Sequence, residues 1–488
     1  MAQRFFEQLE ARRTTLQPDA SRESPSSATL SARQRLALLL DEGTFQEFAP
    51  FLERRLEGEG QPEDGVVAGF GKVEGRRVAV FAQVGTIGDA GFSEMGAQKV
   101  SQVIERARAG GLPVIGLYDS AGLCPEEGAY ALAGPAELLW QQTQTSGLTP
   151  QIAVVAGPAP GALALSVGLA DFIITVAETG HVSLKPGATS TNKEIGLAHW
   201  VAPSDVEALA LTRRLLGYLP ANNLESPPYL SPTDGPWRME GSLDTLVPGD
   251  PTLPYDMYAV LEAVFDKGSF LEVQADFAPN LIVGLARLHG AVAGIVAQQP
   301  MVLAGVLDID ASDKIARFVR TCDAFNIPIV TFVDSPGFLP GVAQEHGGII
   351  RHGAKIVYAY SEATVPKISI VTRKAYGGAY IVMSSKYIRT DLCLAWPSAE
   401  IAVLGAEGAV NILYRKQLKQ ATDPEAARVR LVAEFTEKFS SPFRPAASGH
   451  VDDIIKPSET RPRLIAALEA LKDKRVSGPR KKHGNMPM

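Results

Sequence analysis

The chain repeats itself at a nearly constant spacing, which limits its fold more than any other feature. The segment VAGFGKVEGRRVAVFAQ at 67–83 resembles IVGLARLHGAVAGIVAQ at 282–298, and each matching pair lies 215 positions apart. The same spacing relates DSAG at 119–122 to DSPG at 334–337. A fixed spacing over so many matches indicates two copies of one domain.

Each half has the same order of expected elements: a strand hairpin, a helix, a strand ending in Asp-Ser-x-Gly, a second helix, and a further strand with a turn of small residues. Alternating strands and helices predict an α/β fold. We predict two tandem domains at 30–245 and 246–488, joined by a linker within 217–255. Residues 1–29 are expected to form a helical or flexible arm.

Composition excludes several classes of protein. A net charge of −7 and a pI of about 5.7 give no reason to expect nucleic acid or an anionic membrane as a partner. The three cysteines are far apart, which argues against a zinc site or disulfide framework and favours a reducing, cytoplasmic compartment. We identify no signal peptide and no membrane span.

Small residues occupy a strand-to-helix turn at the same place in both halves. KAYGGAY at 374–380 follows an apolar strand, and PKISIVTRKAYGGAYI at 366–381 aligns with PQIAVVAGPAPGALAL at 150–165. Such a turn can serve packing alone, or it can direct backbone N–H groups at an anion. Its duplication, as Gly161-Ala162 and Gly378-Ala379, favours the second interpretation.

Side-chain catalysis finds little support in the sequence. Ser335 lies in VDSPGF, which is ordinary turn chemistry and not a nucleophile elbow. His346 and His352 are six residues apart, on different faces of a helix, so we predict no metal site. The remaining hypothesis is a reaction in which the substrate or cofactor supplies the base and backbone N–H groups stabilise an enolate-like charge.

Several longer motifs resemble one family. RKAYGGAY, VDSPGFLPGVAQEHGGIIRHGAK, QQPMVLAGVLDIDASDKIARFVR, LAWPSAEIAVLGAEGAVNILYR and the closing KKHGNMPM are similar to the carboxyltransferase (β) subunit of propionyl-CoA carboxylase and related acyl-CoA carboxylases. The resemblance spans almost the whole chain and is looser in the first half. It implies two crotonase-like domains and a homo-hexamer, a trimer of dimers, whose sites lie between subunits.

The resemblance also implies a reaction. Carboxybiotin would deliver its carboxyl group to the α-carbon of an acyl-CoA thioester. Gly378 and Ala379 would hold the ureido oxygen of biotin, and Gly161 and Ala162 the enolate oxygen of the thioester. The substrate-binding positions implied by the family are Ile381, Tyr380, Gly377 and Gly122. Propionyl-specific members tend to have aspartate where this chain has Ile381, so a different acyl preference is expected.

The chain has no Ala-Met-Lys-Met biotinyl site and no ATP-binding glycine-rich loop, so a partner (α) subunit with biotin carboxylase and carrier functions is implied. The first half departs from the family, since Cys124 stands where DSGGAR has arginine. Two alternatives therefore stay open. One is a decarboxylase of the same fold that acts on a malonyl- or methylmalonyl-type thioester, and the other is a catalytically reduced structural subunit. The implied metabolic context is the supply of precursors for fatty acids or polyketides.

Overall fold

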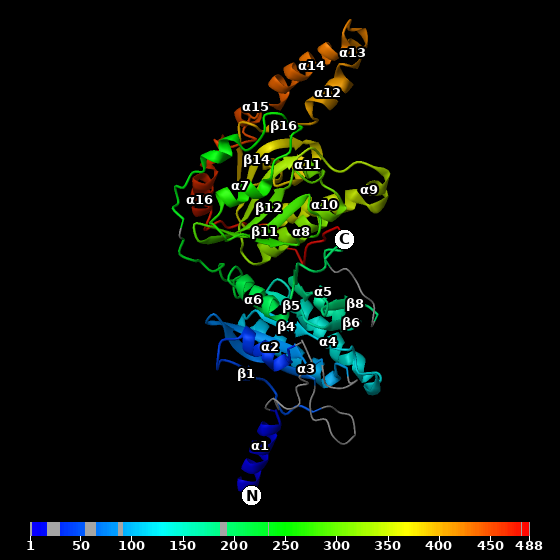
Figure 1. Ribbon diagram of the computed structural model, residues 1–488, viewed down its shortest axis with the longest axis vertical. Coiled ribbons are helices and arrows are strands. Elements are labelled where there is room, and N and C mark those ends of the chain that lie inside the picture. Colours follow the sequence, from blue (N-terminus) through cyan, green and yellow to red (C-terminus); the bar gives the residue numbers. More distant parts are fainter. Residues whose placement is uncertain are drawn as a thin grey trace. The chain divides into compact units, whose positions relative to one another are not determined.

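The computed structural model describes residues 2–16, 30–53, 65–85, 91–185, 193–232, 234–479 and 481–487. It divides into two compact units, Met1–Glu225 (unit 1) and Ser226–Met488 (unit 2). Figure 1 shows an α/β arrangement in each. Most of the predicted arm (17–29) lies outside the described residues, whereas α1 (Ala2–Leu16) is helical.

The described part of unit 1 contains one seven-stranded sheet in the order β1-β2-β3-β4-β5-β7-β9. The strands β1, β2 and β3 are antiparallel, and β3 to β9 are parallel. Its strands are β1 (Gln46–Glu47), β2 (Val66–Val73), β3 (Arg76–Gln83), β4 (Val114–Tyr118), β5 (Gln151–Val155), β7 (Phe172–Val176) and β9 (Trp200–Ala202), with β6 (Pro158–Pro160) and β8 (His181–Ser183) as a separate pair. Its helices are α1, α2 (Ala32–Leu39), α3 (Glu94–Gly110), η1 (Pro125–Glu127), α4 (Tyr130–Thr145), α5 (Ala162–Gly168) and α6 (Asp205–Leu216).

Unit 2 repeats this plan with an eight-stranded sheet among its described residues. The order is β10-β11-β12-β13-β14-β15-β17, and β16 pairs with the end of β14. Its strands are β10 (Leu271–Val273), β11 (Leu281–Leu288), β12 (Ala291–Gln298), β13 (Ile329–Ser335), β14 (Lys367–Tyr376), β15 (Leu392–Ala395), β16 (Glu400–Ala402) and β17 (Asp453–Ile454). Its helical segments are η2 (Gly241–Thr245), α7 (Met257–Val264), η3 (Leu303–Gly305), α8 (Ile309–Ala324), α9 (Val342–Gly347), α10 (Ile349–Glu362), α11 (Gly377–Val382), η4 (Lys386–Ile388), α12 (Ala406–Leu413), α13 (Arg415–Gln420), α14 (Pro424–Phe435), η5 (Thr436–Ser440), α15 (Phe443–Ala447), η6 (Pro457–Glu459) and α16 (Thr460–Ala470).

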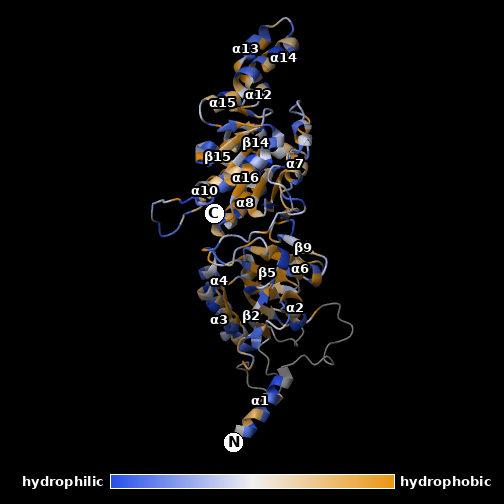
Figure 2. Ribbon diagram, turned by 90° about the vertical axis from the view of Figure 1, so that its left-hand side faces the viewer, coloured by the Kyte–Doolittle hydropathy of each residue, from blue (hydrophilic) through white to orange (hydrophobic). Residues whose placement is uncertain are grey.

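The repeat visible in the sequence extends to local structure. Gly75 and Gly290 both have positive φ, at +78° and +81°, in the turns of the two hairpins. Ser93 caps α3 by accepting the N–H of Gly96, and Asp308 caps α8 by accepting that of Ala311. The central strands are fully buried and mostly apolar, as expected for parallel strands covered on both faces. Figure 2 shows hydrophobic residues inside each unit and hydrophilic ones on outer helix faces such as that of α3.

The boundary between the units differs from the prediction. It falls between residues 225 and 226, whereas 245 and 246 were expected. The segment from 226 to 245 belongs to unit 2 because its backbone and side chains are bonded there. The Leu230 N–H donates to the Gly290 carbonyl, and Arg238 donates to the carbonyls of Ala263 and Phe265.

Candidate functional site

The second turn (Tyr376–Gly378) lies where β14 passes into α11. Gly377 has φ of +56°, and a Cβ there would lie 3.1 Å from the carbonyl oxygen of Val403. Both facts favour glycine at this position. The first N–H groups of a helix have no partner within it, so those of Gly378 and Ala379 can donate to an outside oxygen.

The first turn (Pro160–Ala162) has the same backbone form. Gly161 has φ of +63° and immediately precedes α5. Its counterpart in unit 2 is therefore Gly377, at a spacing of 216. Ala162 corresponds to Gly378, and Leu163 to Ala379.

At this spacing the pairs Gly161-Ala162 and Gly378-Ala379 are one residue out of register, and their predicted roles stay predictions. The N–H of Gly161 donates to the carbonyl oxygen of Ser183 at 2.9 Å, so it is already used. The donors that the helix start offers in unit 1 are those of Ala162 and Leu163. The sequence motif misled because Ala162 resembles Ala379 in identity while it occupies the place of Gly378.

A short parallel strand pair leads into each turn. In unit 1, β6 pairs with β8, and in unit 2 the end of β14 pairs with β16. Pro158 and Pro160 stiffen the first pair, because a proline ring fixes φ. In the second pair the Tyr376 hydroxyl donates to the Glu400 carboxylate, and this contact links the two strands.

The two Asp-Ser-x-Gly turns lie beside these strands. Gly122 has φ of +120°, its N–H donates to the Ser120 hydroxyl at 3.2 Å, and a Cβ on it would lie 3.3 Å from Pro160. The structure thus brings Gly122 next to the residue that precedes Gly161. In unit 2, a Cβ on Gly378 would have only Phe338, just after the second Asp-Ser-x-Gly, at 3.9 Å. The approach to Gly378 is therefore open.

The aspartates of these motifs are paired with arginines from different elements. Asp119 accepts Arg35 Nη1 at 2.7 Å, and the same Arg35 bonds Asp205 at 3.0 Å. Asp334 accepts Arg373 Nε at 3.1 Å. Burial raises the pKa of Asp334, and the Arg373 guanidinium opposes that rise. An unpaired buried carboxylate would be costly, so each arginine is required locally.

The predicted substrate-binding residues separate into two kinds. Ile381 is 45% exposed, one helical turn beyond Gly377, and can meet a ligand. Tyr380 is only 3% exposed, and its hydroxyl lies 3.9 Å from Cys393 Sγ in the core. Its side chain therefore packs in the core of unit 2, and the predicted contact of Tyr380 with substrate stays a prediction.

Sequence reasoning missed Leu165, the counterpart of Ile381 in unit 1. It lies at the same spacing of 216, one helical turn beyond Gly161, and is 53% exposed. The alignment of 150–165 with 366–381 ends on this pair, so the signal was available. Each turn thus carries one exposed aliphatic side chain beside its helix start.

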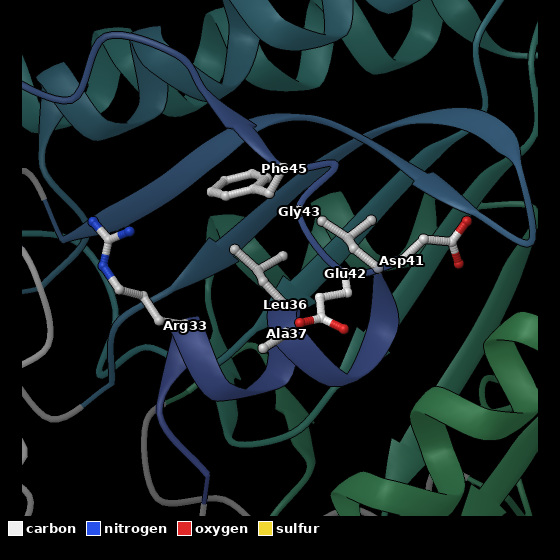
Figure 3. A pocket seen from close by; sticks show the side chains of 8 residues that line it. Arg33, Leu36, Ala37, Asp41, Glu42, Gly43 and Phe45 are labelled. Atoms are coloured by element: carbon white, nitrogen blue, oxygen red, sulfur yellow. The ribbon is translucent and has the colours of Figure 1, made fainter.

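A pocket of about 430 Å³ lies elsewhere on unit 1. Figure 3 shows Leu36 and Phe45 facing each other in it, with Arg33, Asp41 and Glu42 around them. No residue of either turn lines it, so we assign it no part in the site.

Two searches of the described residues were negative. No group of three or more histidine, cysteine, aspartate or glutamate side chains in the described ranges could hold a metal ion. No helix in that part of the chain is long and apolar enough to cross a membrane.

The chain is similar to known proteins over nearly all its length. The family described as "Carboxyl transferase domain" matches residues 26–186 and 183–486. The propionyl-CoA carboxylase carboxyltransferase subunit of Haloferax mediterranei is 48% identical, over 94% of this chain and 93% of the relative. The methylmalonyl-CoA decarboxylase subunit alpha of Propionigenium modestum is 43% identical, over 95% and 94%.

A solved structure supports the same assignment. The transcarboxylase 12S structure, described as a hexamer with methylmalonyl-coenzyme A and methylmalonic acid bound, is 41% identical. It has a TM-score of 0.94 and covers 99% of this chain and 98% of its own. The predicted tandem crotonase-like fold and the predicted family are confirmed. With one family matched across both units, and each unit ending its β–α passage in the same glycine turn, the chain belongs to the carboxyl transferase domain family.

Proposed function

We propose that this chain is the carboxyltransferase subunit of a biotin-dependent acyl-CoA carboxylase and forms a homo-hexamer. The observation that carries the proposal is the pair of matching turns within a chain of this family. Two oxygen atoms must be stabilised during the transfer, one on biotin and one on the thioester, and the two halves supply one turn for each. The alignments cover nearly all of this chain and nearly all of each relative, which supports the whole transfer reaction and not only one part of it.

Carboxylated biotin, carried by a partner (α) subunit, would supply the carboxyl group and a ureido nitrogen able to take the α-proton of the thioester. The N–H groups of Gly378 and Ala379 would hold the ureido oxygen. The open approach to Gly378 fits a flat ring, since the nearest atom to a Cβ there is Phe338 at 3.9 Å.

On the acyl side, the N–H groups of Ala162 and Leu163 would hold the thioester oxygen as it gains enolate charge. Fixed N–H donors stabilise that charge without reorganisation, which lowers the barrier to removal of the α-proton. Gly161 shapes the turn through its positive φ, and Gly377 does the same in unit 2. No side chain of the turns is required as a base.

Carboxylation by the purified chain tests the proposal. The chain would be combined with a promiscuous biotin carboxylase and carrier partner, ATP and bicarbonate. Acetyl-, propionyl-, butyryl- and longer acyl-CoAs would be offered, and products read by mass. A carboxylated product is expected, and absence of product with every acyl-CoA would contradict the proposal.

A decarboxylase subunit is the second candidate, because relatives named methylmalonyl-CoA decarboxylase subunit alpha are as similar as many carboxylase chains. The same two turns would serve the reverse transfer. Incubation of the pure chain with malonyl-CoA or methylmalonyl-CoA distinguishes them. With free biotin present to take the carboxyl group, release of CO₂ at enzymatic rates without a protein partner would favour decarboxylation over carboxylase-only activity.

A structural subunit with a dead first site predicts a different pattern. The pure chain would show no turnover and would co-purify with a second, more typical β subunit. Sustained turnover with only the biotin partner would exclude this reading.

Acyl preference should respond to the two exposed aliphatic side chains. We expect Ile381→Asp and Leu165→Ala each to shift relative kcat/KM across the acyl-CoA panel by about 10-fold or more, since a methylene-sized change in a pocket has effects of that order. Both residues are exposed, so stability should change little. Leu224→Asp, at a 91% exposed position that follows α6 in unit 1 and belongs to neither turn, is the control. An unchanged preference in both variants would remove these residues from the acyl site.

A further inference from the structure

The strand that leads to the second turn is irregular just before it. In the β13–β14 ladder, Val333 is opposite Val371, but Ser335 is opposite Ala375. Two steps along β13 therefore correspond to four along β14, and Thr372–Lys374 form a bulge. A bulge redirects its strand and leaves backbone groups on the β13 side without ladder partners, while Lys374 pairs with Glu400 of β16 on the other side.

The side chain of Asp334 supplies a partner for this bulge. One carboxylate oxygen accepts the Lys374 N–H at 3.1 Å, and the other accepts Arg373 Nε at 3.1 Å. The Asp334 N–H donates to Gln298 Oε1 at 2.9 Å. Asp334 is fully buried, so water cannot replace these bonds.

Arg373 is itself held from a third direction. Its Nη1 donates to the Leu253 carbonyl at 2.7 Å, and its guanidinium lies 4.9 Å from the ring centroid of Tyr255. The carboxylate of Asp334 is consequently fixed in orientation. Lys374, which it holds, is three residues before Gly377.

In unit 1 the backbone before the turn is held in a different way. At the spacing of 216, Pro158 stands in the place of Lys374 and Gly157 in that of Arg373. Proline has no N–H to satisfy and fixes its own φ. Asp119 is paired instead with Arg35, which comes from α2. Holding the backbone before the turn through a carboxylate is thus particular to unit 2.

We propose that Asp334 is a positioning residue for the second turn. By holding the Lys374 N–H it sets the course of β14 and so the direction of the N–H groups of Gly378 and Ala379. The proposal rests on the proposed function, in which those groups hold the ureido oxygen of biotin. It assigns Asp334 to the biotin half-reaction and not to thioester binding.

The variant that tests this is Asp334→Asn, which keeps size and shape. An asparagine has one acceptor oxygen and one NH₂, so in either orientation either Lys374 N–H or Arg373 Nε loses its acceptor. The assay measures carboxyl transfer from methylmalonyl-CoA to free biotin, with the concentration of each substrate varied in turn. We expect kcat/KM for biotin to fall about 10- to 100-fold, as for a small misplacement of reacting groups. The KM for methylmalonyl-CoA should change by a smaller factor than the KM for biotin, because only its acyl group meets a residue beside the second turn, Ile381, while its thioester oxygen is held in unit 1.

The chain offers a matched control in Asp266→Asn. Asp266 also accepts backbone N–H groups, from His289 and Gly290, and pairs with a buried arginine, Arg461, at 2.7 Å. These contacts lie at the hairpin before β12. Because β12 to β14 are parallel, that hairpin and the second turn lie at opposite ends of the strands. Asp266→Asn should lower the melting temperature and leave both KM values unchanged per folded enzyme.

The outcomes are separable. If the wild-type chain moves no carboxyl group to biotin, the proposed function fails. If it does, and Asp334→Asn behaves like Asp266→Asn, the positioning role is overturned. Should Asp334→Asn not fold, Arg373→Lys keeps the charge but loses the fixed Nε donor. A rise of about 3-fold or more in the biotin KM alone would support the role, and two unchanged KM values would overturn it.

Discussion

Replacing Gly378 with valine is expected to slow carboxyl transfer on the order of 100- to 1,000-fold, the usual cost of losing one oxyanion donor. The first carbon of a side chain fits at this position, because only Phe338 comes within 4 Å of it. The two branched methyl groups of valine extend further, into the space from which an oxygen must approach the N–H groups. The backbone of the turn and the core beneath it should remain intact.

Gly378→Ala is the matched control for this variant. Alanine already occupies the equivalent position in unit 1, at Ala162, so one methyl group is compatible with such a turn. We expect Gly378→Ala to keep much more activity than Gly378→Val at the same melting temperature. Steady-state rates with biotin as acceptor would measure both. Wild-type rates in the valine variant would mean that the turn serves packing alone.

The second large effect is on stability and involves Lys314. Its Nζ donates to the carbonyls of Gln274, Phe277, Ala278 and Leu281 at 2.9, 2.6, 3.3 and 2.7 Å, and the residue is 1% exposed. Burial lowers the pKa of Lys314 to about 8, so at neutral pH an ammonium holds these carbonyls. The contacts tie α8 to the loop before β11.

Lys314→Met fills similar volume but removes the ammonium donor from all four carbonyls, of which Gln274 and Ala278 also accept the N–H groups of Phe277 and Leu281. Leaving a buried polar group without its partner costs about 1–3 kcal/mol, and we expect a loss of this order in the free energy of unfolding of unit 2. Urea unfolding followed by hydrogen exchange at α8 would measure it. Lys267→Met, at an exposed lysine of the same unit, should change little. Equal stability of the two variants would show that Lys314 does not stabilise the packing of α8 on the loop before β11.

Much of the architecture was predictable because the sequence contains the same pattern of elements twice. The spacing of 215 to 216 between DSAG and DSPG, and between the two turns, predicted tandem α/β domains before any contact was known. Which side chains of the short helices face the core was not predictable. The helix α11 has only six residues, so no periodic pattern shows that Tyr380 is buried and Ile381 exposed, and the bulge in β14 before it contacts the buried side chain of Asp334. Nothing in the linear pattern reveals such a contact, nor the hydrogen bonds that place residues 226–245 in unit 2.

The one-residue match between Gly161 and Gly377 bears on how a duplicated chain can diversify. The residues before each turn act only through the direction of the backbone. The prolines of unit 1 can therefore replace the carboxylate and arginine of unit 2 without any change in a ligand contact. The glycine is harder to replace, because a residue with a side chain is strained at its positive φ. A duplicated chain can therefore change the residues around one turn while the other half stays as it was, and the glycine of positive φ is what the two turns keep in common.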